Sequence, residues 1–187
     1  MKKILATVMI GILITMPVYA LSDTKTAAVS ATVTSVFSVA IYPNTVEFGN
    51  VQPGEWKELK TAAGNYHNEV VCKSNSGQTW YVKVKVDRAL TAGTNTIPVG
   101  NFNWNCGWFG SKNGAGGTQG SGVFANPTTG WVPFTTANNL VYTCGANEKS
   151  NLPNGNGGTF SYALQVPDAQ PIGTYTATIT YTMTETL

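Results

Sequence analysis

The sequence predicts an all-β protein built as an antiparallel sandwich of two sheets. Apolar and polar residues alternate along several short segments, which is the pattern of half-buried strands. Turn segments rich in Gly, Pro and Asn separate these strands at intervals of about ten residues. No segment places apolar residues at helical spacing between capping residues. Together these features favour a sandwich over a barrel, the alternative that strand spacing alone leaves open.

The first element along the chain, residues 1–20, is expected to be a signal peptide. Two lysines precede an apolar run over residues 4–16, and the segment closes on Val18-Tyr19-Ala20. The run is too short for a membrane-spanning helix, so a retained anchor is the weaker alternative. We expect a secreted chain, extracellular or at the cell surface, that does not insert into a membrane after cleavage.

The charge of the mature chain excludes two classes of partner. The whole chain carries 11 basic and 9 acidic residues, and Lys2 and Lys3 belong to the predicted signal. The mature charges therefore balance, and nothing in them supports binding to nucleic acid or to anionic lipid.

The second element, residues 21–42, is predicted to be a long N-terminal strand. Alternation runs from Ala27 to Tyr42, whereas strands in globular proteins average about five or six residues. The residues that share its apolar face are Val29, Ala31, Val33, Phe37, Val39 and Ile41. Either the strand bends and crosses between the two sheets, or residues 22–34 add a strand to the next subunit. In the second case they form a donor strand for self-assembly.

Residues 43–187 are predicted to form the sandwich domain. Residues 69–73 and 79–87 flank Ser74-Asn75-Ser76-Gly77, which is the signal of a hairpin. In the second arm the residues predicted to face inward are Trp80, Val82, Val84 and Val86. Further strands are predicted over 99–109, 130–134, 139–144 and 158–166.

The last strand, TYTATITYTMT over residues 174–184, carries threonine at every even position. Threonine fits a pleated surface and keeps its hydroxyl hydrated, so this row is expected to face water. The residues expected to face the core are Tyr175, Ile179, Tyr181 and Met183. A threonine array that binds ice or a crystalline polymer would need matching rows on neighbouring strands, and this chain has one row.

Three cysteines allow one disulfide and one remaining thiol, as in a protein from an oxidising compartment. Cys106 and Cys144 both lie beside Gly and Asn near strand ends, so their pairing is predicted, with Cys72 a buried thiol. The other pairings stay open, and the odd cysteine could cross-link subunits. No zinc is expected, because the chain has no CxxC or HxxxH spacing and His67 is its one histidine.

The tryptophans in a segment rich in Gly and Trp, residues 100–134, have two possible roles. Trp104, Trp108 and Trp131 either pack in the core or stack on sugar rings at one end of the sandwich. Loops at the ends of a sandwich commonly carry ligand sites.

Catalysis is not predicted, and no cofactor is expected. His67 has no nucleophile motif beside it, and the acidic residues are scattered along the chain. The glycine run lacks the Lys-Ser/Thr of a phosphate loop.

Two stretches resemble a known group of proteins. VEFGNVQPG at residues 46–54 and the closing IGTYTATITYT are similar to segments of bacterial fimbrial (pilin) subunits and spore-coat-U-type surface proteins. The early cysteine of those families is absent. The resemblance implies an immunoglobulin-like, pilin-like fold and a non-enzymatic structural subunit of a fibre or surface layer. Such a subunit would assemble by β-strand addition, with copies of itself or other surface proteins as partners. The alternative is a secreted adhesive module that binds polysaccharide through the Trp-rich segment.

Overall fold

The computed structural model describes residues 25–60, 66–110, 118–120, 130–145 and 155–187. The chain divides into two units, residues 1–33 and 34–187. The predicted signal peptide lies outside the described residues. In the first unit the described part, residues 25–33, contains no strand.

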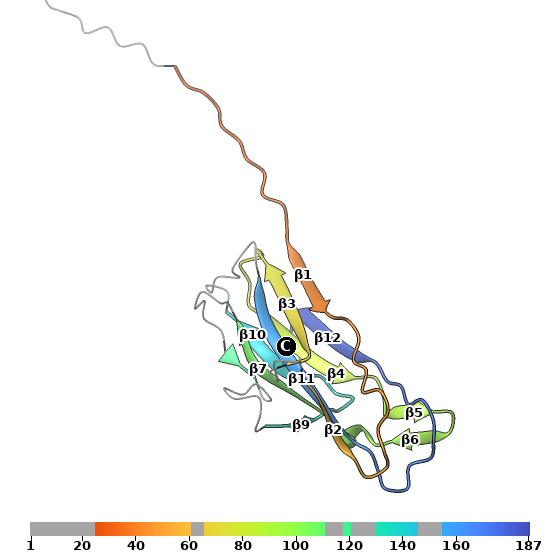
Figure 1. Cartoon of the computed structure of the whole chain (residues 1–187). Helices are drawn as coiled ribbons and strands as arrows, with labels where there is room; N and C mark the ends of the chain where they lie inside the picture. The colour runs from red at the N-terminus through yellow and green to blue at the C-terminus, as the bar shows by residue number, and fades with distance from the viewer. Residues whose placement is uncertain (1–24, 61–65, 111–117, 121–129, 146–154) are drawn as a thin grey trace, which may run out of the picture. The chain divides into compact units, whose positions relative to one another are not determined.

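The second unit confirms the predicted all-β, antiparallel sandwich (Figure 1). Sheet A has the order β1 (Phe37–Tyr42), β3 (Asn68–Ser74), β11 (Asn156–Gln165), β7 (Phe102–Gly110) and β9 (Val132–Pro133), with β2 (Trp56–Leu59) also paired to β11. Sheet B has the order β12 (Ile179–Thr184), β4 (Trp80–Val86), β10 (Asn139–Cys144) and β8 (Thr118–Gln119). A small hairpin, β5 (Leu90–Ala92) and β6 (Asn95–Ile97), and a 3₁₀ turn, Val99–Asn101, complete the elements.

Side-chain alternation places the core between the two sheets as predicted. In β4 every second residue is buried, and these are Trp80, Val82, Val84 and Val86. In β3 the buried set includes Val70 and Cys72. These two inner faces pack against the aromatic residues of β7 and β11, which form one continuous core.

The predicted hairpin at residues 74–77 is wrong, because β3 belongs to sheet A and β4 to sheet B. The chain crosses between the sheets at this point. Asn75 makes its contacts outside the turn: its Oδ1 accepts from Val36 N at 2.8 Å and its Nδ2 donates to Thr34 O at 2.7 Å. The residues therefore do form a connection between two strands, but not a hairpin. The side chain of Asn75 binds the main chain of residues 34–36, just before β1.

The long N-terminal strand is present only in its last part, since β1 covers Phe37–Tyr42. The expected crossing between sheets is absent from the described residues before it, which form no strand from Lys25 to Val36. The compact unit includes β1 and begins at Thr34.

The threonine-rich segment ends in β12, with the predicted side chains facing inward. Tyr181 is buried, and Ile179 and Met183 are partly buried against the core. Before the strand begins, Thr176 forms an isolated bridge with Thr91 beside the small hairpin. The threonine-rich segment is therefore bound to the rest of the fold before β12 begins.

Candidate functional site

One side of the sandwich, here called the open edge, consists of β1 and β12. Each is the last strand of its sheet, and the two lie beside each other (Figure 1). β1 is paired only to β3 and β12 only to β4 among the described strands. Each therefore presents main-chain N–H and C=O groups along one side without a strand partner. Such an edge is a template for a further strand.

The inner face of β1 is incompletely covered at this edge. Phe37 lies opposite Ser74 and Val39 opposite Cys72, and both partners point into the core. Directly opposed residues share a face, so Phe37 and Val39 also face inward. They nevertheless remain 43% and 37% exposed. Apolar side chains on the core side of a strand are exposed only where a covering element is missing.

The described end of the N-terminal segment carries the matching apolar residues. Val29 is 94% exposed and Val33 85% exposed, and Ala31 between them is exposed as well. The structure therefore brings none of the three predicted assembly residues into a sheet. Residues 21–24 of the predicted donor strand lie outside the described part.

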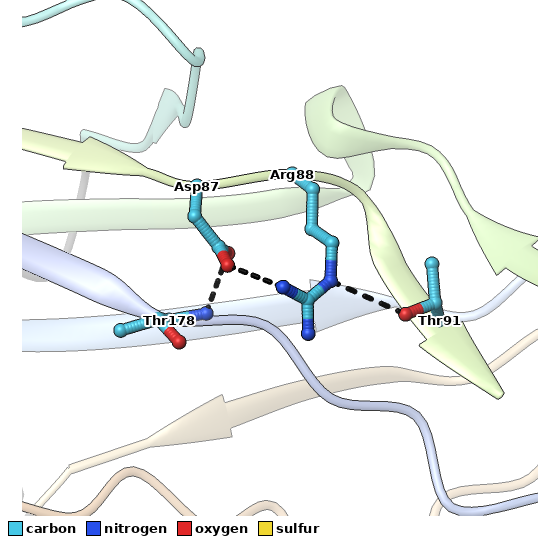
Figure 2. Close-up of polar contacts among 4 residues, drawn as sticks. All are labelled: Asp87, Arg88, Thr91 and Thr178. Carbon is cyan, nitrogen blue, oxygen red and sulfur yellow. Dashed lines mark hydrogen bonds and ion pairs between the residues drawn. The ribbon is translucent and has the colours of Figure 1, made fainter.

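The start of β12 is held by a polar clasp from the end of β4 (Figure 2). Asp87 Oδ1 accepts from Thr178 N at 2.7 Å, and Asp87 N donates to Thr178 O at 2.9 Å. The other carboxylate oxygen accepts from Arg88, whose Nε reaches Thr91 Oγ1 at 3.4 Å. This clasp fixes where β12 begins against β4, and with it the position of one strand of the open edge.

A buried pair of tyrosines joins β12 to sheet A. The hydroxyl of Tyr181 bonds that of Tyr162, which also donates to Asn68 Oδ1 at 2.7 Å. Burial raises the pKa of both phenols well above the ordinary value. The strand is thus attached to the core from its inner face as well as through its ladder.

A second cluster of interest lies on the outer face of sheet A, away from the open edge. Glu58, Ala163, Asn103 and Pro133 are successive partners across β2, β11, β7 and β9, so they form one row on one face. Ala163 and Asn103 are buried although they point away from the core. The outer face of sheet A is therefore covered at this point.

Two tryptophans lie over this outer face. Trp56, two residues before Glu58, packs edge-to-face on Trp131, two residues before Pro133, with ring centroids 5.9 Å apart. Trp56 Nε1 donates to Glu58 Oε1 at 3.2 Å. Lys60 pairs with the other oxygen of Glu58, and its Nζ lies 5.7 Å from the Trp131 ring centroid. We call these four residues the tryptophan cluster.

The carboxylate of Glu58 is stabilised in its charged form. Partial burial alone would raise its pKa, but hydrogen bonds from Lys60, Trp56 and Trp131 and the charge of Lys60 lower the pKa below its ordinary value. The cluster therefore holds an ionised carboxylate and an ammonium group in contact, with no net charge.

The tryptophans that lie together at the surface differ from the predicted set. Trp104 is fully buried between Phe134 and Phe160, so it is a core residue and cannot stack on a ligand. The side chain of Trp108 lies outside what the structure describes. Trp131 is the one predicted member with a partly exposed ring, and its partner Trp56 was not predicted. Trp56 and Trp131 are distant in sequence, and only the pairing of β2 and β9 into sheet A brings them together.

The predicted Cys106–Cys144 disulfide is not present in the structure, where all three cysteines are buried. The two face different parts of the core. Cys144 Sγ lies 3.7 Å from Asn156 Nδ2, whereas Cys106 lies opposite Phe160 in the pairing of β7 with β11. Asn156 and Phe160 are four residues apart on β11, which is about 13 Å at about 3.3 Å per residue. Burial raises the pKa of the Cys72 thiol to about 12.

The described residues contain neither a metal centre nor a membrane-spanning helix. No three His, Cys, Asp or Glu side chains there gather as a metal centre would require. No helix in that part of the chain is long and apolar enough to span a bilayer. The ring of His67 contacts Thr45 O through Nε2 at 2.9 Å and packs edge-to-face on Tyr162.

No family model, curated protein or solved structure matches the chain. Among the described residues, the open edge and the tryptophan cluster are the two features that bear on function.

Proposed function

We propose that the protein is an exported structural subunit that assembles head to tail, with residues 22–34 of one copy adding a strand to the open edge of the next. The product is a fibre or a surface layer at the cell exterior, and the chain acts without catalysis. The fold this implies is the pilin-like variant of the sandwich.

One observation carries the proposal. The chain contains an exposed segment with the apolar alternation of a strand, and it also contains a sheet edge that has no neighbouring strand on its outer side among the described strands. Val29 and Val33 are exposed on one face of an alternating segment, and Phe37 and Val39 are exposed on the core side of β1. Burying each valine at such an edge would stabilise the assembly by roughly 1.5–3 kcal/mol. Main-chain hydrogen bonds to β1 and β12 would add to this.

The contacts of Asn75 favour insertion into another copy over folding back onto the same one. Asn75 binds Val36 N, Val36 O and Thr34 O, which lie directly between the apolar segment and β1. A hairpin back along β1 would have to turn within these residues, and residues 34–36 contain neither Gly nor Pro. A head-to-tail contact between copies is also open-ended, which is what a fibre requires.

The test is electron microscopy of the exported native protein and of three variants. Filaments of uniform width are expected from the native chain and none from a chain lacking residues 21–33, which retains Thr34 and its contact. Val29→Asp with Val33→Asp should abolish filaments, because two charges would enter the edge. The matched control, Ser30→Asp with Thr32→Asp, puts the charges on the opposite face of the same segment and should still assemble.

Filaments that persist without residues 21–33 would refute the proposal. So would equal loss of filaments in the two double variants, since strand addition depends on which face of the segment is apolar.

A further inference from the structure

We propose that the tryptophan cluster, Trp56, Glu58, Lys60 and Trp131, is a binding site for a neutral saccharide. It is separate from the open edge: β1 ends one side of sheet A, while Trp131 directly precedes β9 at the other side. The inference therefore does not depend on strand addition, and it gives the subunit a ligand to hold at its surface.

The indole of Trp56 supplies a surface that is both exposed and fixed. The residue is 42% exposed, yet its N–H is held by Glu58 and its ring is held against Trp131. Large apolar side chains at an exposed position usually have no such second contact to fix them. A ring whose orientation is set before binding loses little entropy when a ligand stacks on it. The apolar C–H face of a sugar ring fits a surface of this kind.

The polar groups beside the ring match hydroxyls. A carboxylate offers about four lone-pair positions, and Glu58 accepts from Trp56 Nε1 with one oxygen and pairs with Lys60 through the other. Each oxygen therefore keeps lone-pair capacity to accept from a hydroxyl. The ammonium of Lys60 has three N–H groups, and its bond to Glu58 takes one of them. An acceptor and a donor next to an aromatic face are what a polyhydroxylated ring requires.

The charge of the cluster selects a neutral ligand. Glu58 and Lys60 neutralise each other, and Lys60 also lies over Trp131. An anionic or cationic ligand would have to compete with this pair and would gain no unpaired charge in return. A neutral hydroxyl can bond to both groups while the pair stays intact.

The experiment is affinity electrophoresis of the full mature chain in gels containing a neutral polysaccharide: dextran, a mixed-linkage β-glucan or a mannan. A parallel gel contains dextran sulfate. We expect retardation by at least one neutral polymer, with Trp56→Ala weakening the binding about tenfold or more. Tyr42→Ala is the matched control, because Tyr42 is a 64% exposed aromatic at the opposite edge of sheet A.

A second variant separates the site from general stability. Glu58→Gln leaves Trp56 in place but removes the charge that orients Trp56 and Lys60, so it should also weaken binding while the melting transition stays close to that of the native chain. The proposal is overturned if none of the three neutral gels retards the native chain, if Trp56→Ala is retarded as strongly, or if dextran sulfate alone binds. Filament formation is measured separately, so failure here leaves the assembly result unaffected.

Discussion

The two sides of the sandwich differ in the edges they present. The open edge ends in β1 and β12, both six-residue strands. On the other side the described strands at the ends of the sheets are β8 and β9, with two residues each. β9 also contains Pro133, which has no N–H to offer a partner. Short or proline-containing edges are the common protection against unwanted pairing, and here that protection is present on one side only.

Among the described strands, the two six-residue edge strands β1 and β12 are the ones long enough to support an extended ladder with an added strand. A six-residue strand is about 20 Å long and can support a ladder, whereas two residues support at most one or two hydrogen bonds. Exposed apolar side chains on an inner face occur at the long edge, in Phe37 and Val39. Edge length and exposed apolar surface thus coincide.

The largest expected effect on filament assembly comes from a charge placed inside the open edge. Val39→Asp puts a carboxylate among the apolar groups that a donor strand would cover, so filaments should disappear. Thr118→Asp in β8 is the matched change on the other side, at an exposed position, and should leave assembly intact. Negative-stain microscopy compares the two. Loss of filaments in both variants, or in neither, would show that the two sides do not differ in function.

The next effect concerns the attachment of β12 at high pH. Because burial raises the pKa of Tyr162 and Tyr181, both phenols stay protonated in the folded chain while the unfolded chain ionises near pH 10. Stability should fall above about pH 9, where the Cys72 thiol of the unfolded chain ionises, and more steeply above pH 10, where each tyrosine adds a loss of about 1.4 kcal/mol per pH unit. Urea unfolding at pH 8, 10 and 11 measures this loss.

Tyr181→Phe should remove the part of this loss that one buried phenol contributes, about 1.4 kcal/mol per pH unit above pH 10, and should leave the parts due to Tyr162 and Cys72. Tyr42→Phe changes a phenol that is largely exposed and should leave the loss as it is in the native chain. A stability that does not change between pH 9 and 11 would contradict the proposed attachment.

The smallest effect is at the clasp where β12 begins. Asp87→Ala removes the acceptor of Thr178 N and should cost about 1 kcal/mol. Arg88→Ala removes an ion pair whose arginine side chain is 52% exposed, so a few tenths of a kcal/mol are expected. Denaturant melts of the two variants provide the measurement. A larger cost for Arg88→Ala than for Asp87→Ala would mean that the ion pair, rather than the bond to Thr178, holds the strand.

Much of the fold could be predicted because alternation is a local signal. The inward residues of β4 and β12 follow from period-two patterning, and β10 was predicted with its observed bounds, residues 139–144. The hairpin prediction failed because the pattern around Asn75 reports a turn but not which sheet the next strand joins. Of the described part of the predicted N-terminal strand, the single chain forms β1 alone, since alternation states what could pair and not whether a partner is present.

The site residues were predicted less well, because they depend on contacts between distant segments. Trp131 was predicted as a candidate because it lies in the segment rich in Gly and Trp, whereas its neighbour Trp56 lies outside that segment and was not predicted. Trp104 has the same residue type and a similar sequence context, and only the register of β7 against β11 places it in the core. The structure does not form the predicted Cys106–Cys144 bridge, and closeness to strand ends does not decide which part of the core a cysteine faces.

The hold of Asn75 on Thr34 and Val36 has a practical consequence. Both contacts are made to main-chain atoms, so they tolerate other side chains at those two positions and demand nothing of the residues upstream. The extension can therefore be shortened, exchanged or grafted with a foreign peptide while the folded body keeps the same starting point. We expect a chain begun at Thr34 to keep the folded body, because both contacts of Asn75 remain in it.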